Sequence, residues 1–224
     1  MRAPISVVIP TLEAAATLPA TLATLVEALE GGLIREVIIC DGGSGDATLE
    51  IAEKWGCETL TMPPSRGGQL RHGCQCAQGD WLLILHADSQ LDPGWSSAAR
   101  HHLRSGCVGW FHLAFDAGGM AGRMVAAWAN LRSHMGLPYG DQGLLLPRAV
   151  YHQVGGYTDI PLFEDVALVR ALRGRLAPVG AGITTNAAKY QRQGWLRRGL
   201  RNLITLAGYA AGLSPGKLAA FYRR

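Results

Sequence analysis

Short apolar runs rich in β-branched residues alternate with amphipathic segments along the first half of the chain. The runs are typical of buried strands, and apolar residues three or four positions apart in the intervening segments are typical of helices. The pattern predicts strands at Ile5–Ile9, Ile34–Cys40, Glu58–Met62 and Trp81–Leu85, and helices at Thr17–Leu29, Ala47–Trp55 and Gly68–Ala77. Such alternation favours an α/β fold with a mostly parallel central sheet and helices on both faces.

The second half of the chain has a less regular pattern. It predicts strands at Val108–Phe115 and Gly143–Leu146, and helices at Ala121–His134, Glu164–Arg173 and Trp195–Leu213. The chain has 224 residues, which is enough for one substantial hydrophobic core but too few for two independent cores. We therefore expect a single domain over residues 1–224.

The charged residues are distributed unevenly. All 17 acidic residues lie in residues 1–165, whereas residues 166–224 contain 11 basic residues and no acidic one. Such a basic tail favours an anionic partner, such as lipid headgroups or a diphosphate, and a solvated basic surface is the alternative. We do not expect a nucleic-acid partner, because few aromatic residues lie between the basic ones and no recognition motif is present.

The sequence predicts a cytoplasmic location. Pro10 and Glu13 interrupt the apolar run at the amino terminus, unlike in a secretory signal. The apolar stretch Leu203–Leu213 is too short to span a bilayer, and five cysteines, an odd number, fit a reducing compartment. The inner face of the membrane is the alternative location if the basic tail binds lipid.

Polar or flexible residues follow three of the predicted strands at their carboxyl ends. The segments are PTLE at residues 10–13, DGGS at residues 41–44 and HAD at residues 86–88. In open α/β sheets, ligands bind beyond the carboxyl ends of the strands. Asp41 can accept hydrogen bonds from a base or a ribose hydroxyl, although Asp and Gly are also common in a plain turn between a strand and a helix.

Two further segments indicate phosphate or metal chemistry. Asp88 is a hard oxygen ligand suited to Mg²⁺ or Mn²⁺, with His86 as a second ligand or a donor to phosphate. An isolated Asp after a strand is, however, more often a helix cap. Arg66 and Arg71, in the segment SRGGQLR, carry guanidinium groups that can bind phosphate or a base edge.

Glu164 and Asp165 open a predicted helix. The helix macrodipole favours acidic residues in a first helical turn, so this pair has a purely structural explanation. The functional alternative is that one of the two carboxylates faces the ligand crevice and acts as a general base.

Six segments, taken together and in this order, resemble the family 2 glycosyltransferases of the GT-A fold. They are SVVIPTLEAAATLPATL, VIICDGGSGDAT, SRGGQLRHG, LILHADSQLDPGW, GDQGLLLPRAVYHQVGGY and PLFEDVALVRAL. The tail GLSPGKLAAFYRR is similar to the bacterial branch associated with radical-SAM and selenium-domain proteins. The resemblance covers nearly the whole chain.

The resemblance implies transfer of a sugar from a nucleoside diphosphate sugar to a hydroxyl acceptor, with inversion at the anomeric carbon and assistance from Mg²⁺ or Mn²⁺. It assigns residues 1–116 to a nucleotide-binding half, residues 117–185 to an acceptor and catalytic half, and residues 186–224 to a basic helical tail. The implied site residues are Pro10, Thr11, Glu13, Asp41 and Arg66 for the nucleoside, Asp88 for the metal ion, Asp165 with Glu164 for the base, and Asp141 and Gln142 for the acceptor.

The chain departs from the family pattern at two places. His86 stands where the family often has the first Asp of its Asp-x-Asp element, so metal binding would depend more on water and phosphate oxygens. Lys189 and Tyr190 stand where close relatives tend to have an arginine and an aromatic residue. A cation is therefore kept at this position, but bidentate phosphate binding is not.

The predicted helix Trp195–Leu213 is amphipathic. Its apolar stripe comprises Leu196, Leu200, Leu203, Ile204, Ala207 and Ala211. Such a helix suits the cytosolic face of an anionic membrane, which Arg197, Arg198 and Arg201 would contact and which would supply a lipid-linked acceptor. Docking of the stripe on the protein's own core or on a dimer partner is the alternative.

Two other functions fit parts of the pattern. A nucleotidyltransferase would use the same kind of crevice, with a cation from SRGGQLR to activate a triphosphate, but a Gly-rich loop after the first strand is missing. A nucleotide-sugar binding module without turnover would need Asp41 and Asp88 and would tolerate the loss of Asp165.

Overall fold

The computed structural model of the protein describes residues 2–172 and 174–222. Over these residues, eight strands form one sheet in the order β3-β2-β1-β4-β7-β6-β8-β5. The strands are β1 (Ile5–Thr11), β2 (Ile34–Asp41), β3 (Glu58–Thr61), β4 (Trp81–Ile84), β5 (Ser89–Leu91), β6 (Val108–Phe115), β7 (Leu144–Pro147) and β8 (Leu176–Thr185). Only β5 and β7 run antiparallel to their neighbours. The mostly parallel α/β sheet predicted from the sequence is confirmed.

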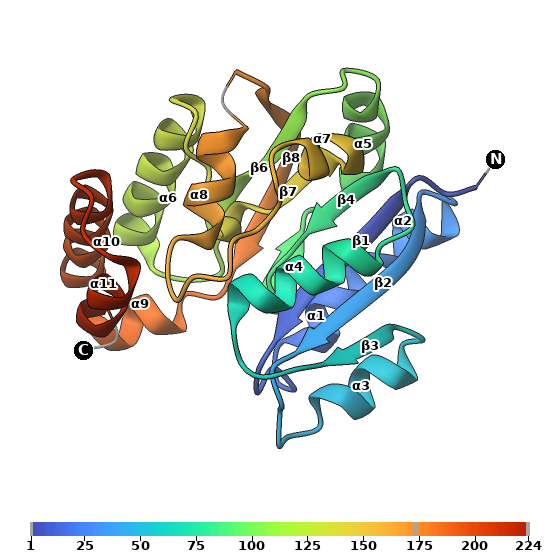
Figure 1. The fold of residues 1–224 in the computed structure, drawn as a ribbon, viewed down its shortest axis with the longest axis horizontal. Helices are drawn as coiled ribbons and strands as arrows, with labels where there is room; N and C mark the ends of the chain where they lie inside the picture. Colours follow the sequence, from blue (N-terminus) through green and yellow to red (C-terminus); the bar gives the residue numbers. More distant parts are fainter. Residues whose placement is uncertain (1, 173, 223–224) are drawn as a thin grey trace.

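Helices cover both faces of this sheet (Figure 1). They are α1 (Leu18–Ala23), α2 (Val26–Glu30), α3 (Thr48–Lys54), α4 (Arg66–Cys76), α5 (Trp95–Leu103), α6 (Gly119–His134), α7 (Arg148–Gln153), α8 (Glu164–Ala171), α9 (Ala188–Gln193), α10 (Trp195–Ala210) and α11 (Pro215–Tyr222), with a 3₁₀ turn η1 (Gly140–Gln142). Ile5, Val7 and Ile9 of β1 belong to the apolar core shared with α1 and α5, whereas Val8 belongs to the core shared with α4 and α8. The two-residue period of a strand thus builds one core on each face.

The predicted helix Thr17–Leu29 is two short helices, α1 and α2. The chain turns at Thr24 and Leu25, whose N–H groups donate to carbonyls only three residues back, those of Thr21 and Leu22. Leu22 and Leu25 are both buried. The apolar spacing continues across the break, so the sequence pattern could not show it.

Several elements lie outside the ranges predicted above, namely β5, β8, α5, α7, α9, α11 and η1. The longest of them is β8, whose apolar pattern is interrupted by Pro178, Gly180 and Gly182. Its strand conformation is set by tertiary pairing, with β6 on one side and β5 on the other. Within the described ranges, we find no helix with the length and apolar character needed to cross a bilayer.

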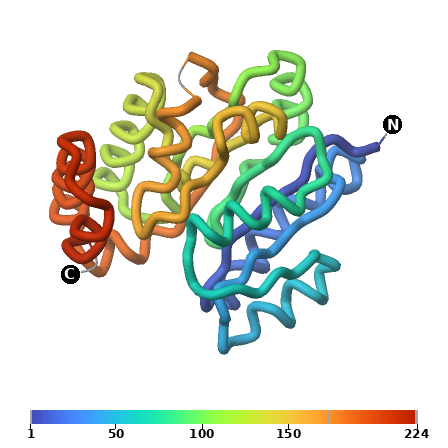
Figure 2. Tube along the Cα trace, viewed as in Figure 1, coloured from blue at the N-terminus to red at the C-terminus, as the bar shows by residue number. Residues whose placement is uncertain are grey.

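The sheet brings the carboxyl ends of its parallel strands to one edge. Thr11 lies beside Asp41 in the β1–β2 pair, and Phe115 lies beside Thr185 in the β6–β8 pair. Because β7 is antiparallel to β4 and β6, its first residue, Leu144, lies at this same edge. Figure 2 shows the C-terminal helices, orange to red, gathered at the end of the molecule opposite the N-terminus. These helices form one wall of the site.

Candidate active site

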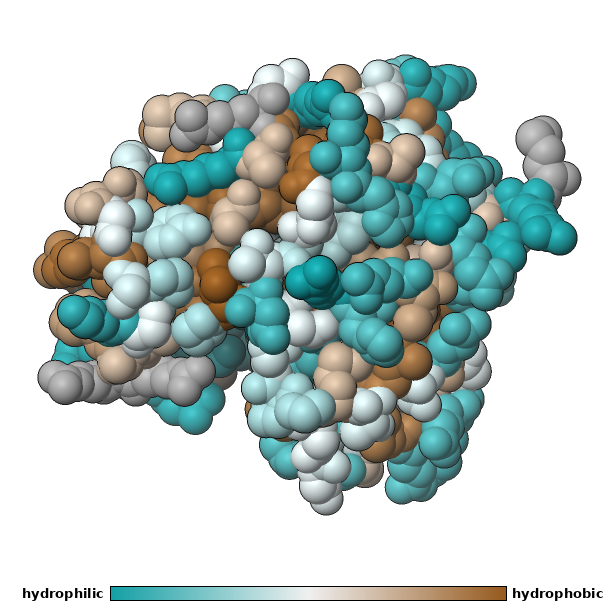
Figure 3. Space-filling model, in the orientation of Figure 1, coloured by the Kyte–Doolittle hydropathy of each residue, from teal (hydrophilic) through white to brown (hydrophobic). Residues whose placement is uncertain are grey.

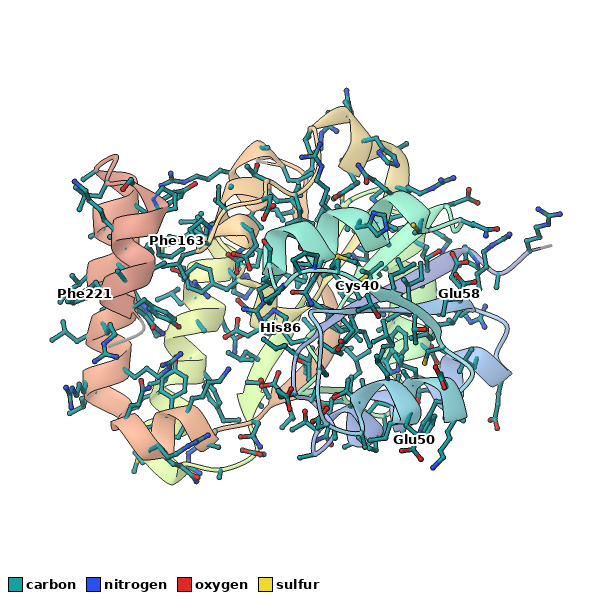
Figure 4. The ribbon with its side chains drawn as sticks, turned by 60° about the horizontal axis from the view of Figure 1, so that its bottom comes forward. Cys40, Glu50, Glu58, His86, Phe163 and Phe221 are labelled. Carbon is teal, nitrogen blue, oxygen red and sulfur yellow. The ribbon has the colours of Figure 1, made fainter. Side chains whose placement is uncertain are left out.

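A cleft of about 250 Å³ lies where β4, β6 and β8 end. Figure 3 shows the surface notched between the C-terminal helices and the N-terminal half, and Figure 4 looks toward this region, with His86 between the two parts. The predicted site residues that line the cleft are Arg66, His86, Asp88, Asp141, Glu164 and Asp165. The fold therefore brings together residues from four separate segments of the chain.

Arg66 connects two sides of the cleft. It is the first residue of α4, whose N-cap Ser65 accepts a hydrogen bond from the Gly68 N–H. The Arg66 Nη2 atom lies 3.3 Å from His86 Nδ1, and its Nε atom lies 3.7 Å from Glu164 Oε1. Burial, together with the nearby charges of Arg66 and Lys189, lowers the pKa of His86 well below its ordinary value. The imidazole is therefore neutral, and its Nδ1 can accept from the guanidinium.

The two acidic residues that begin α8 have different surroundings. Glu164 is buried, and burial together with the charge of Asp165 raises its pKa to about 7, despite the opposing effect of Arg66. The Asp165 carboxylate accepts a hydrogen bond of 2.7 Å from the Gly140 N–H. Phe163 precedes the pair with a left-handed φ of 69°, and its ring stacks on Tyr209 of α10 at 4.8 Å. Packing against α10 thus holds a strained residue next to the acidic pair.

Asp141, in η1, also reaches the cleft. Its Oδ1 atom is buried and has no hydrogen-bond partner among the described residues. Burial raises its pKa, which the Arg132 guanidinium counteracts and the Asp165 carboxylate reinforces. A buried carboxylate oxygen without a donor is costly unless a ligand or a cation completes it.

The side chains that could hold a divalent ion are oxygen donors. Asp88 and Asp141 both line the cleft. In the described part of the chain, no group of three or more His, Cys, Asp or Glu residues is arranged to hold a metal ion. The two carboxylates of Asp88 and Asp141 nevertheless fit Mg²⁺ or Mn²⁺, because these ions bind one or two carboxylates and complete their coordination shell with water and phosphate oxygens. His86 fits less well, because the Arg66 cation lies against its Nδ1.

Four of the predicted nucleoside residues, Pro10, Thr11, Glu13 and Asp41, lie next to one another at the ends of β1 and β2, outside the lining of the 250 Å³ cleft. Asp41 is fully buried and accepts four hydrogen bonds, from the hydroxyls of Thr11 and Ser44 and from the N–H groups of Gly43 and Ser44. Burial alone would raise the pKa of Asp41, but these hydrogen bonds outweigh it and the pKa is lowered. Asp41 therefore shapes the loop that follows β2.

Glu13 and Pro10 complete this end of β1. Glu13 is exposed, has a left-handed φ of 52°, and accepts a 2.7 Å hydrogen bond from the Gly45 N–H. Pro10 is buried within β1. The Gln69 side chain of α4 joins the two strands, because its amide donates to the carbonyls of Thr11 and Cys40.

Two further predicted site residues, Arg71 and Gln142, also do not line the cleft. Arg71 is exposed on α4 and lies on a different face of the helix from Arg66. Gln142 is fully buried, and its amide is used internally. The amide oxygen accepts from Ser133 and Arg132, and the amide nitrogen donates to Asn130 and to the carbonyl of Phe111. Gln142 thus holds η1 in place and does not face an acceptor.

The C-terminal helices contribute lining residues that sequence reasoning missed. They are Arg198, Asn202, Thr205 and Tyr222. Arg198 donates hydrogen bonds of 2.7 Å to Gln193 Oε1 and to the Tyr222 hydroxyl. It therefore belongs to the cleft wall, and its expected contact with membrane lipid was wrong. The polar spacing of residues 198, 202 and 205 is that of one helix face and could have indicated this wall.

Comparisons with known proteins place the chain in a family. Residues 6–127 match the family described as Glycosyl transferase family 2. A PGL/p-HBAD biosynthesis glycosyltransferase of Mycobacterium bovis (strain BCG / Pasteur 1173P2) is 36% identical over 106 residues, and the match covers 41% of this chain and 38% of that protein. The protein of the same name from Mycobacterium tuberculosis (strain ATCC 25177 / H37Ra) matches equally. The chain thus spans well under half the length of these relatives.

Solved structures share the fold. Staphylococcus aureus TarS has a TM-score of 0.64 and 15% identity, over 96% of this chain and 41% of that chain. Glucosyl-3-phosphoglycerate synthase from M. tuberculosis, crystallised with Mn²⁺, UDP and glucosyl-3-phosphoglycerate, has a TM-score of 0.59 and 19% identity, over 90% of this chain and 79% of that chain. The architecture is therefore the GT-A fold expected from the sequence.

Proposed function

Because this chain belongs to glycosyl transferase family 2, we propose that it transfers a sugar from a nucleoside diphosphate sugar to a hydroxyl acceptor, with inversion at the anomeric carbon. One observation carries the proposal. A single cleft at the carboxyl edge of the sheet brings together Asp88, the pair Glu164 and Asp165, and the cations Arg66 and Lys189. Carboxylates and cations in one cleft suit a reaction in which a diphosphate leaves while a hydroxyl is deprotonated.

The donor is proposed to lie along the edge of the sheet. Its nucleoside would contact the loop that Asp41 organises, and its diphosphate would reach Arg66 and Lys189. Lys189 lies in the first turn of α9 and close to Asp88, whose charge raises the pKa of Lys189 against the larger lowering effect of burial. S. aureus TarS and the M. tuberculosis synthase have been crystallised with UDP, which supports a nucleoside diphosphate as the leaving group.

A divalent ion, Mg²⁺ or Mn²⁺, would neutralise the charge that develops on the departing diphosphate. Asp88 is the residue proposed to hold it, with Asp141 as the second oxygen donor on the same cleft. The presence of Mn²⁺ in the crystals of the M. tuberculosis synthase supports this assignment.

Asp165 is proposed as the general base. Its carboxylate is held in the cleft by the Gly140 N–H, so that it can take the proton of an acceptor hydroxyl. The acceptor oxygen would then bond to the anomeric carbon from the face opposite the diphosphate, whose bond to the sugar breaks. Glu164, buried beside Arg66, would set the local charge around the base.

The first test is calorimetric titration of a panel of nucleoside diphosphates and their sugars, with and without Mn²⁺. Wild-type protein and Asp88→Ala are compared with the control Asp80→Ala, which changes an exposed residue directly before β4. We expect one base to bind in a Mn²⁺-dependent manner in wild type and in the control, and at least about tenfold more weakly in Asp88→Ala. Absence of binding across the panel would refute the donor site, and equal Mn²⁺-dependent binding by Asp88→Ala would remove Asp88 from the metal role.

A further inference from the structure

Helix α10 has its polar face inward and its apolar face outward. Arg198, Asn202 and Thr205 line the cleft. On the opposite face, Leu196, Leu200, Leu203 and Ile204 are exposed, and the exposed fraction of Leu196 reaches 88%. A helix that packed only on its own domain would bury its apolar stripe. Within the described residues, the stripe therefore does not dock on the protein's own core, which was one of the two alternatives.

Helix α6 carries a second exposed apolar stripe that continues one residue beyond its carboxyl end. It comprises Met120, Met124, Trp128, Leu131 and Met135, which follow one another at intervals of three or four residues and so share one helix face. α6 and α10 are in contact, and Trp128 and Leu203 line the same small cavity between them. Figure 3 shows brown side chains at the left end of the molecule, where Figure 1 places α10 and α11.

We call these two stripes together the α6–α10 face. Each of its nine side chains, four from α10 and five from the α6 stripe, is at least 44% exposed. Soluble monomers rarely expose apolar residues in such contiguous arrays, and an array of this kind marks an interaction surface. Exposed methionines and leucines with one tryptophan are the side chains that enter the boundary between lipid headgroups and acyl chains.

The charge around this face indicates the partner. α6, α9, α10 and α11 contain no acidic residue. Their exposed basic residues include Arg123, Arg192, Arg197 and Lys217. Two copies of the chain pressed together through this face would bring like charges close, with no carboxylate from these helices to neutralise them. Anionic headgroups would neutralise them directly.

We propose that the α6–α10 face docks on a lipid bilayer that contains anionic headgroups. The helices would lie in the plane of the interface, with the apolar side chains inserted and Arg197 and Arg201 among the phosphates.

The docked face adjoins the active site. An apolar cavity of about 60 Å³ between α6 and α10 shares Phe115, Tyr139, Asp141, Tyr190 and Asn202 with the cleft. An acceptor held in the bilayer would therefore meet the acceptor side of the cleft, which points to a lipid-linked hydroxyl. This consequence rests on the proposed function, whereas the docking surface itself does not.

The test is co-sedimentation of the protein with vesicles of phosphatidylcholine, with and without phosphatidylglycerol, in the absence of donor. Two double variants are compared with wild type: Leu196→Gln with Leu200→Gln, and Arg197→Gln with Arg201→Gln. The control is Leu29→Gln, an exposed leucine of α2 in the N-terminal half. We expect wild type and the control to bind the anionic vesicles alike. Each double variant should bind at least about tenfold more weakly, because exposed side chains are changed and the core is kept.

Equal vesicle binding by wild type and both double variants would overturn the proposal, as would the absence of wild-type binding. Sedimentation velocity without vesicles tests whether a second copy of the chain, and not a bilayer, covers the face. A dimer that the leucine double variant dissociates, together with no vesicle binding, would assign the face to a second copy of the chain. Vesicle binding that persists while no nucleoside diphosphate binds would leave the docking surface standing and remove the proposed function.

Discussion

Carboxylates at the two ends of the carboxyl edge of the sheet have opposite surroundings. At the ends of β1 and β2, Asp41 accepts four hydrogen bonds and its pKa is lowered. In the cleft, Glu164 has one ion pair of 3.7 Å and a pKa raised to about 7, and Asp141 keeps an unpartnered oxygen. Hydrogen bonds within the fold occupy the Asp41 carboxylate, whereas the Glu164 and Asp141 carboxylates remain able to act on a ligand. The number of donors around a buried carboxylate, and not its residue type, separates the two roles.

The largest expected effect tests the reactive end. Asp165→Asn keeps the shape and the Gly140 contact but removes the proposed base, so turnover should fall by at least about a hundredfold while donor affinity is kept. Steady-state kinetics and calorimetry measure the two quantities. The matched control is Asp159→Asn, at an exposed position outside the cleft lining. Normal turnover in Asp165→Asn would move the base to another residue.

The same substitution at the structural end should act on stability. In Asp41→Asn, an amide NH₂ replaces an oxygen that accepts from buried donors, so we expect the free energy of unfolding to fall by about 2 kcal/mol. Urea denaturation of Asp41→Asn and Asp165→Asn side by side measures the difference. Asp165→Asn should change the free energy of unfolding by less than about 1 kcal/mol. Equal losses in the two variants would contradict the division of roles.

A cation in the cleft gives a smaller expected effect. Lys189→Gln removes a positive charge from the cleft wall, so the affinity for a nucleoside diphosphate should fall about tenfold. Lys54→Gln, at an exposed site on α3, is the control and should leave the affinity unchanged. Calorimetry at two ionic strengths makes the test sharper, because an interaction in the cleft is screened less than a surface one. An unchanged affinity in Lys189→Gln would place the diphosphate elsewhere.

The pH dependence of the free energy of unfolding gives the smallest expected effect and distinguishes the Glu164 carboxylate from the Asp41 carboxylate. Glu164 has a folded-state pKa of about 7 against an ordinary 4.5, so between these values the native state holds more protons than the unfolded state. The free energy of unfolding should therefore fall as pH rises through this window, by up to about 1 kcal/mol per pH unit. Glu164→Gln should remove this slope in urea denaturation. The lowered pKa of Asp41 acts in the opposite sense, because its stabilisation is lost as pH falls below its ordinary value of 3.8.

Much of the candidate cleft could be anticipated because its residues follow strands or open a helix. Asp88 follows β4, and Glu164 and Asp165 begin α8, positions that the apolar pattern of the neighbouring segments locates. Gln142 and Arg71 show the limit of this approach. A polar residue near a strand end can turn inward and satisfy buried groups, as Gln142 does, and a residue on a helix can face solvent, as Arg71 does.

The sequence by itself determined the α/β class, the strands β1 to β4, and the carboxylates that could meet at the strand ends, because local apolar periodicity specifies these features. The tertiary structure alone decided three things. It formed β8 from a segment with no strand pattern, and it paired the polar face of α10 with the cleft. It also left the apolar faces of α6 and α10 side by side on the surface. Each depends on which elements become neighbours, and contacts between residues far apart in the chain leave no periodic signal within any one segment.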